Sequence, residues 1–513
     1  MTRARAAIAG VVATTLALAT TETLLAVLPG TGSLFVAVGN AVIGATPGPI
    51  VSFAIDTFGS ANRLVLLSSM MVGMSGAGAL IARASVRRRW IAPVGFGLFG
   101  VAGAAAGAAD ATITTSSAVL ATAGGVVVGT AALAKVLDVL RGGESTPEPL
   151  QDGTEIEPQA TRRRFLGWTV ALAGSAGVLL ATGRFLQDRA ATTVARTTTD
   201  LAAPAQPLPL PPAGASLDVD GISPLVTPNE DFYRIDTAFT IPRVDASTHR
   251  IAFTGMVDRP FEVTFDELLD LADTEMDVTL SCVSNQVGGD LIGTARWLGV
   301  PLADLLERAG VQAGADQIVG RSVDGWTGGF PVEAAFDGRP AIIAVGMNGE
   351  PLPARHGYPA RLVIAGLYGY VSDTKWLSEI ELTTFDAFDA YWVPRGWSAL
   401  GPIKTQSRID VPRDSASVDA GTVAVAGVAW SDEHGVSAVE ISVDDGPWQP
   451  ADLADELATT TWRQWIYRWE ASAGNHVLRV RATDADGRPQ TADISPPAPD
   501  GATGHHTIRV SVA

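Results

Sequence analysis

The sequence predicts an α-helical membrane bundle of about five spans, followed by an α+β domain and a C-terminal all-β sandwich. Three observations lead to this prediction. The chain has 513 residues, of which 47% are hydrophobic, and its mean hydropathy of +0.23 is high for a water-soluble protein. Long runs of Ala, Val, Leu and Gly fill residues 1–140. From about Val226 onward, short alternating segments and turn residues replace them, which is typical of strands.

Five apolar runs are each close to the roughly 20 residues that a helix needs to cross a bilayer. They are Ala6–Leu28, Leu64–Ala82, Trp90–Ala108, about Ile113–Leu140 and Phe165–Thr182. Arginines follow the second run and precede the fifth, so the positive-inside rule places everything after the fifth span outside. Residues 30–62 are interrupted by Pro47 and Pro49, and we interpret them as an external interfacial or re-entrant loop. We find no charge inside the spans that marks a proton or substrate path.

The bundle of four spans therefore covers residues 1–141, and a polar cytoplasmic loop covers 142–164. The loop ends in Thr161-Arg162-Arg163-Arg164-Phe165-Leu166, which resembles the twin-arginine export motif. The alternative is three positive-inside arginines beside an ordinary span. The fifth helix follows at 165–185, and we expect it to remain as an anchor.

A proline-rich stretch lies within residues 186–215, with its densest part at Ala202–Pro212. Proline fixes φ and favours extended backbone, so this stretch is predicted to be a semi-rigid stalk. It would hold the next domain, residues 216–399, a short way off the membrane.

That domain mixes short helices and strands. Thr264 and Glu267 have the spacing of a capping box at the start of a helix ending at Leu271. A second helix is predicted over Leu302–Ala309, closed by Gly310. Between them, a strand ends at Cys282 and is followed by Gly288-Gly289.

Cys282 is the sole cysteine of the chain. This excludes an intrachain disulfide, a CxxCH haem attachment and a Cys-ligated iron–sulfur cluster within the chain. A lone cysteine at a strand end is often a small buried hydrophobe. It can also be a nucleophile, although no base is near it in sequence, or a soft metal ligand. Glycines after it would let a bulky cofactor approach the backbone.

The residues around Cys282 are recognisable. The segment TLSCVSNQVGGDLIGTARWLGVPLADLLERAG closely resembles the cofactor-binding segment of the sulfite oxidase family of molybdopterin-dependent oxidoreductases. The resemblance continues through MNGEPLPARHGYPARLVIAGLYGYVSDTKWLSEIEL and covers about residues 225–513. It implies a sulfite-oxidase-like α+β domain that binds molybdopterin, the molybdenum cofactor, in a membrane-anchored bacterial member. It also implies that Cys282 is catalytic, as the thiolate that binds molybdenum.

The resemblance extends to further positions. His356 and Arg361 match the pair that contacts the pterin and its phosphate, which charge-assisted donors bind well. The remaining matches to cofactor-contacting positions are Asp373, Thr374, Lys375, Asp324, Thr327 and the paired aromatics Phe232 and Tyr233.

One position departs from the family pattern. Sulfite oxidases have a substrate-binding arginine after the paired aromatics, and Ile235 stands at that position here. Arg234 could replace the arginine by a shift of one residue. Loss of this cation removes the obvious partner of a dianionic substrate, so the chain is not expected to be a simple sulfite oxidase.

Residues 400–513 alternate strands and turns. Strands are predicted at Thr422–Trp430, Ser437–Val443, Thr461–Trp469, His476–Thr483 and Thr507–Val512. An immunoglobulin-like sandwich fits this pattern, and the family resemblance implies a dimerisation domain and hence a homodimer. Trp448, Trp462 and Trp465 are predicted to be core or interface anchors.

The function that follows is two-electron oxo transfer on a small-molecule substrate outside the cytoplasmic membrane. Electrons would pass to or from a separate haem protein or the quinone pool. The net charge of −18 argues against nucleic-acid binding. One alternative is a non-catalytic, membrane-anchored binding or assembly protein on the same fold. A cysteine-nucleophile enzyme is another, which predicts a thiol that alkylators can reach.

Overall fold

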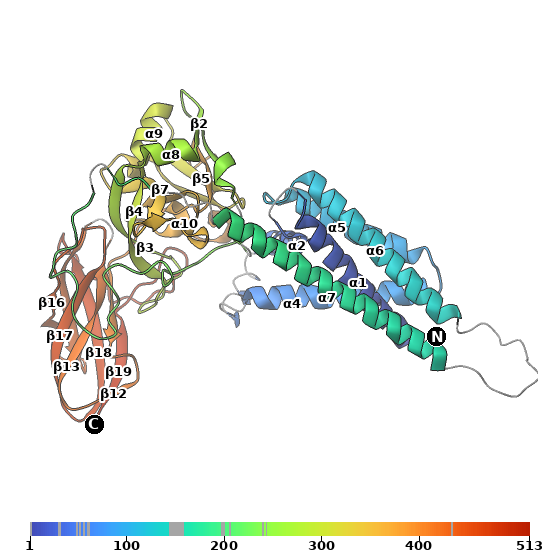
Figure 1. Ribbon diagram of the computed structural model, residues 1–513. Coiled ribbons are helices and arrows are strands. Elements are labelled where there is room, and N and C mark those ends of the chain that lie inside the picture. The colour runs from blue at the N-terminus through green and yellow to red at the C-terminus, as the bar shows by residue number, and fades with distance from the viewer. Residues whose placement is uncertain are drawn as a thin grey trace, which may run out of the picture. The chain divides into compact units, whose positions relative to one another are not determined.

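The computed structural model describes the chain except for residues 1–2, 29–31, 48–49, 51–52, 55–56, 59–61, 143–158, 196–200, 205–206, 239–240, 243 and 432–433. The side chains of residues 62–63, 142, 159–162 and 184–195 also lie outside the described set. The chain divides into two compact units, Met1–Thr197 and Thr198–Ala513 (Figure 1).

The named elements of the first unit are all helices. Its helices are α1 (Arg3–Leu25), α2 (Leu34–Ala45), α4 (Asn62–Ser85), α5 (Ile91–Ala109), α6 (Thr115–Gly142) and α7 (Gln159–Ala195). Five stretches of the described helices are long and apolar enough to cross a membrane. They are Arg3–Leu25, Leu64–Ser85, Ile91–Ala109, Thr115–Arg141 and Arg163–Gly183, close to the five predicted spans.

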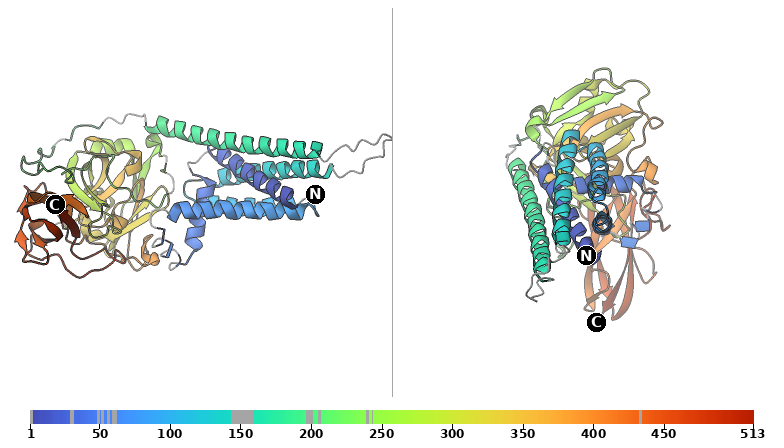
Figure 2. Two further views of the ribbon diagram at one scale, coloured as in Figure 1. Left: turned by 90° about the horizontal axis from the view of Figure 1, so that it is seen from below. Right: turned by 90° about the vertical axis from the view of Figure 1, so that its right-hand side faces the viewer.

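Helix α1 packs against α4, α6 and α7, and Figure 2 shows these helices running beside one another. Small residues allow the close approach. A Cβ on Gly10 would lie 2.1 Å from the carbonyl oxygen of Gly78 on α4, so only glycine fits there. Small residues at helix crossings let backbones approach closely, which is how apolar helices associate in a bilayer.

Glu22 is a charged residue inside the first predicted span. This carboxylate lies on α1, and its Oε1 accepts a hydrogen bond from the backbone N–H of Phe35 at 2.9 Å. Ser33 caps the same end of α2 by accepting from Val36 N. Glu22 therefore satisfies the free N–H groups at the start of a helix of 12 residues, which is too short to span.

The export-like motif lies at the start of α7. Phe165 is buried in the core of the bundle, while Arg163 and Arg164 are exposed. The side chains of Thr161 and Arg162 and most of the 142–164 loop lie outside the described residues. Use of the motif for export stays a prediction.

The second unit begins with two sheets, coloured green to orange in Figure 1. One has the order β2-β1-β10-β5-β6, and the other has the order β3-β4-β7-β8 with β9 paired to β7. The strands are β1 (Arg250–Gly255), β2 (Phe261–Thr264), β3 (Thr274–Ser281), β4 (Ile292–Pro301), β5 (Gln317–Ser322), β6 (Thr327–Pro331), β7 (Ala341–Met347), β8 (Glu350–Pro351), β9 (Arg361–Ile364) and β10 (Leu377–Thr383).

Short helices connect these strands. They are η2 (Ala246–Thr248), α8 (Phe265–Leu271), α9 (Leu302–Ala309), η3 (Val332–Ala335), η4 (Ala354–His356), α10 (Gly369–Ser372) and η5 (Val393–Arg395). The predicted caps are confirmed: Thr264 accepts from Glu267 N at 3.1 Å, and Gly310 ends α9 with φ +71°.

The C-terminal part of the unit consists of two further sheets, with orders β11-β13-β17-β16 and β12-β19-β18-β14-β15. A shared core of residues from both sheets includes Val425, Ile441, Trp465 and Val480. The strands are β11 (Gln406–Val411), β12 (Ala416–Val418), β13 (Gly421–Trp430), β14 (Val436–Val443), β15 (Gln449–Pro450), β16 (Asp452–Leu453), β17 (Arg463–Ala471), β18 (Gly474–Asp484) and β19 (Thr507–Val512). All five predicted strands are present, and the immunoglobulin-like assignment stays a prediction.

Of the three tryptophans predicted to be anchors in this part, Trp465 is fully buried in that core. Trp462 is buried against the first two sheets, where its Nε1 donates to Leu225 O at 2.8 Å. Trp448 is half-buried, with the guanidinium of Arg481 over its ring at 4.4 Å.

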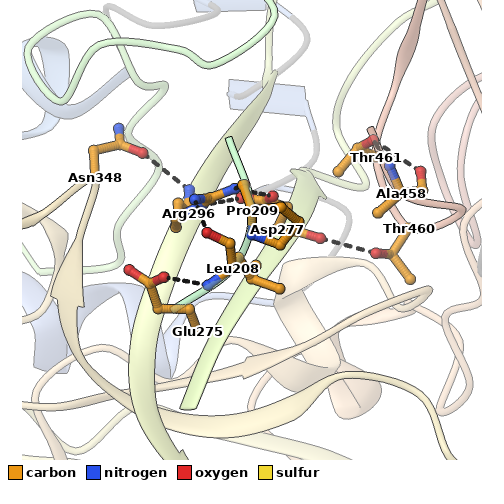
Figure 3. Close-up of polar contacts among 9 residues, drawn as sticks. All are labelled: Leu208, Pro209, Glu275, Asp277, Arg296, Asn348, Ala458, Thr460 and Thr461. Carbon is orange, nitrogen blue, oxygen red and sulfur yellow. Dashed lines mark hydrogen bonds and ion pairs between the residues drawn. The ribbon is translucent and has the colours of Figure 1, made fainter. Parts of the chain in front are cut away.

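The proline-rich stretch is not a free spacer in its described second half. Leu208 N donates to Glu275 Oε2 at 2.9 Å, and Arg296 donates to the carbonyls of Leu208 and Pro209 (Figure 3). Arg296 is in turn held by both carboxylate oxygens of Asp277, at 2.9 and 2.7 Å. The stretch is therefore fastened to β3 and β4 as it enters the unit.

Candidate active site

Cys282 directly follows β3 and is 8% exposed. Its backbone N–H donates to Leu291 O at 2.9 Å, and its carbonyl accepts from Asn285 N at 3.0 Å. The side-chain oxygen of Asn285 accepts from Leu291 N, also at 3.0 Å. These bonds close the loop from 282 to 291, so the thiol sits on a fixed backbone at a strand end.

Two opposing effects act on the thiol. Burial raises the pKa of Cys282, since a thiolate is poorly solvated in the interior. Hydrogen bonds with Ser284 and the positive charge of Lys375 act in the opposite direction. In the absence of a metal, burial prevails and the thiol form is favoured, so a bound cation would be the natural partner of the thiolate.

The C-terminal sheets hold the cysteine loop from the outside. Arg408 of β11 donates to Gly289 O at 2.6 Å and is itself fixed by Asp410 at 2.6 Å. Gly288 has φ +78°, and a Cβ there would lie 2.2 Å from the ring of His506. The glycines were expected to make room for a cofactor. Gly288 instead makes room for this histidine, because only glycine tolerates both the φ and the contact.

His356, Arg361 and Asp373 come together although they lie on three different elements. His356, at the end of η4, is hydrogen-bonded through Nε2 to Asn229 O at 2.8 Å. Arg361, which starts β9, donates to His356 O at 3.1 Å and lies 3.6 Å from Asp373. Burial lowers the pKa of His356 to about 4, which keeps its ring neutral at pH 7.

The aromatic residues complete one wall. Phe232 stacks on Tyr233 at 5.3 Å and meets the ring of His356 edge-on at 5.7 Å. Burial raises the pKa of Tyr233 well above its usual value, and the charges of Asp373 and Cys282 act in the same direction. Tyr233 therefore lies within electrostatic reach of both Cys282 and Asp373.

Lys375 pairs with a residue that the sequence did not single out. Its ammonium forms an ion pair with Asp236 and donates to Ile235 O at 3.1 Å. Arg234 binds the other oxygen of Asp236 at 2.8 Å. An Arg-x-Asp spacing directly after paired aromatics was the available signal, but only the fold shows that it meets Lys375.

Asp324 and Thr327 differ in their surroundings. Asp324 lies in the turn after β5, where burial raises the pKa of its carboxyl and the charge of Asp236 adds to this effect. It is thus close to the pair formed by Asp236 and Lys375. Thr327 Oγ1 accepts from Tyr391 N at 3.0 Å, so its hydroxyl is engaged in holding a neighbouring loop.

Four buried polar atoms among these residues have no hydrogen-bond partner in the described part of the chain. They are Asn285 Nδ2, Arg361 Nε, Asp373 Oδ2 and Thr374 Oγ1. A buried polar group without a partner costs about 1–3 kcal/mol, so native proteins rarely leave several together. Two donors and an acceptor beside a hydroxyl suit a large polar ligand such as a pterin with a phosphate group. The residues present therefore fit the cofactor that the sequence resemblance implies.

Comparison with known proteins gives the same result. Residues 238–392 match the family described as oxidoreductase molybdopterin binding domain. The chain is 28% identical over 320 residues to mitochondrial sulfite oxidase of Homo sapiens, covering 53% of this chain and 58% of that protein. It is 29% identical over 284 residues to sulfite oxidase of Arabidopsis thaliana, covering 46% of this chain and 72% of that protein.

A shorter match is NADH nitrate reductase of Spinacia oleracea, 32% identical over 178 residues, covering 29% of this chain and 19% of that protein. Among solved structures, sulfane dehydrogenase SoxCD from Paracoccus pantotrophus covers 56% of this chain and 81% of its own, with 22% identity and a TM-score of 0.49. The chain spans 58% of the length of the mammalian sulfite oxidases that it matches.

The fold and the family match define a molybdopterin-binding oxidoreductase domain. Residues 238–392 therefore carry a molybdopterin-binding oxidoreductase domain, and the chain is similar to sulfite oxidases. These matches imply that the domain binds molybdopterin.

Proposed function

We propose that this protein is a molybdenum-cofactor-dependent oxidoreductase that acts on a small substrate outside the cytoplasmic membrane. When bound, the cofactor supplies two-electron oxo transfer to or from such a substrate. The observation that supports the proposal best is the buried Cys282 together with unpartnered buried polar atoms on Asn285 of its loop and on Arg361, Asp373 and Thr374, which are predicted to contact the cofactor. The non-catalytic alternative gives no reason to keep such costly groups together.

Each residue has a role in this proposal. The thiolate of Cys282 is the protein ligand of the metal, a soft donor on a backbone that the 282–291 loop holds in place. Arg361, Thr374 and Asn285 would donate to polar atoms of the bound pterin and its phosphate, and Asp373 would accept from it. His356 stays neutral and orients the segment that leads to Arg361.

The orientation and the partners are part of the same proposal. Arg83, Arg87–Arg89 and Arg141 flank the apolar helices on one side, which by the positive-inside rule is cytoplasmic. The chain has no CxxCH haem site, so electrons pass to or from a separate haem protein or quinone. The C-terminal sheets would form an immunoglobulin-like dimerisation domain, and the functional unit would be a homodimer.

Metal analysis tests the central claim. Full-length protein made in a host that synthesises the molybdenum cofactor should contain about one molybdenum and one pterin per chain. A redox-dye screen that starts with sulfite and sulfoxides then identifies the substrate and direction. Folded protein that holds neither molybdenum nor pterin would refute the proposal and favour a binding or assembly role.

A further inference from the structure

A buried acidic residue, Asp236, lies beside Lys375. The Asp236 side chain is 2% exposed, and its two oxygens face two different cations. One oxygen pairs with Lys375, whose side chain is 14% exposed, and the other lies 2.8 Å from Arg234, which is 40% exposed. A single buried carboxylate thus serves both cations at this edge of the site.

Arg361, the more deeply buried cation of the site, also has a carboxylate beside it. Arg361 lies 3.6 Å from Asp373, and both side chains are 5% exposed. Arg355 is the remaining cation near His356; it donates to Asn229 O at 2.9 Å, and the described residues show no carboxylate paired with it. A cofactor phosphate would draw on Arg355 and Arg361, so the described residues offer no further unmatched cation beside Cys282 for the substrate.

We propose that Asp236 is a specificity-determining residue that cancels the charge of Lys375 and Arg234 beside Cys282, so that the site selects an uncharged small substrate over a dianion such as sulfite. This rests on the proposed function and narrows its substrate class. The neighbouring Ile235, 49% exposed, stands where the family's substrate-binding arginine is expected and adds no charge.

The physical reason is the cost of moving a dianion out of water. That cost is recovered only if cations in the site are free to pair with it. A carboxylate that is already paired with those cations disfavours a dianion in two ways. It repels the negative charge, and it occupies the cations with which the dianion would pair. An uncharged substrate with one polar oxygen loses little hydration and can accept a single hydrogen bond from Lys375.

Sulfate binding tests this directly, because sulfate is a dianion of similar shape to sulfite that does not react. Sulfate is titrated calorimetrically into detergent-solubilised full-length protein, and molybdenum and pterin contents are measured on the same samples. The variants are Asp236→Asn, Ile235→Arg and the control Glu262→Gln, which removes one charge from an exposed position on β2. Wild type and control should bind sulfate weakly, whereas Asp236→Asn should bind roughly tenfold tighter or more, since one full charge beside two cations is removed.

Cofactor content should be unchanged in Asp236→Asn, because Asp236 is not needed to hold the pterin. Equal sulfate affinity in Asp236→Asn, control and wild type would overturn the inference, as would tight binding by the wild type. Should Asp236→Asn fail to fold, Ile235→Arg decides, since it adds a cation at a half-exposed position and must also strengthen sulfate binding. Wild type that lacks molybdenum would refute the proposed function, whereas the sulfate comparison would still decide the role of Asp236.

Discussion

Asp373 Oδ2 lies 3.6 Å from the guanidinium of Arg361, where both side chains are 5% exposed, yet neither this oxygen nor Arg361 Nε has a hydrogen-bond partner. Burial raises the pKa of Asp373 to about 6, although the charge of Arg361 acts against it. The two charges are close enough to attract but not to satisfy each other. A polar ligand that bonds to both would complete the pair.

Removing the charge of Arg361 alone should lower the stability of the protein more than removing the charges of both Arg361 and Asp373. Arg361→Met leaves Asp373 uncompensated, and breaking a buried pair costs about 3–5 kcal/mol. The double variant Arg361→Met/Asp373→Asn should regain most of that stability while still lacking bound pterin. Urea unfolding followed by tryptophan fluorescence measures the first effect, and pterin analysis the second. A double variant as unstable as the single one would contradict the pairing.

Cys282→Ser should give a folded protein that has lost its activity. The hydroxyl is nearly the same size as the thiol but a much harder, less acidic ligand, so turnover on the identified substrate should fall about a hundredfold or more. Pterin should remain bound, because its contacts come from other residues. Undiminished turnover would show that Cys282 is not the ligand. Reaction of native holoprotein with a thiol alkylator would favour a free nucleophile.

Arg408 is expected to affect molybdenum binding, although it lies on the C-terminal sheets. Arg408→Ala releases Gly289 O and removes the cation that pairs with Asp410, so the cysteine loop loses its outer support. Molybdenum content should fall by about 10-fold, the scale seen when support of a metal ligand is lost. Arg468→Ala, which removes an exposed arginine of β17, is the matched control and should retain full occupancy. Equal molybdenum contents in Arg408→Ala and Arg468→Ala would show that Arg408 does not support the metal ligand.

The C-terminal sheets should show a small dependence of stability on pH. The hydrogen bond with Asp444, at 2.7 Å, and the Ser472 carbonyl raise the pKa of His476 above 6.5. A raised histidine pKa contributes stability below the unfolded value, and the contribution is lost as pH rises through the folded value. The carboxylate of Asp444 is 49% exposed and solvent screens the pair, so a contribution of about a few tenths of a kcal/mol is expected. His476→Gln should flatten the difference in thermal midpoint between pH 6 and pH 8.

Much of this architecture was predictable from the sequence because it depends on local patterns. The five apolar runs, the cap at Thr264, the end of α9 at Gly310 and the C-terminal strands each follow from residues near in the chain. The meeting of His356, Arg361, Asp373 and Cys282 was accessible only through the family resemblance, since no local pattern joins them.

Three features could not be predicted from the sequence, because each depends on a residue that is far away in the chain. Asp236 pairs with Lys375, which is 139 residues away. Gly288 is required by the close approach of the His506 ring. The proline-rich segment reads as a spacer because prolines disfavour regular structure, whereas its carbonyls are held by Arg296. Glu22 is different, since it is visible within an apolar run and its role as a helix cap needed the fold.

The fastening of the proline-rich segment has a mechanical meaning. Strand β3 receives the Leu208–Pro209 segment through Asp277 and Arg296, and the carbonyl of Asp277 also accepts from Thr460 of the C-terminal part (Figure 3). The tether from the apolar helices therefore meets an ion pair before the chain reaches Cys282. A pull along that tether would load this ion pair first and then β3 and β4, the two strands that the Cys282 loop connects.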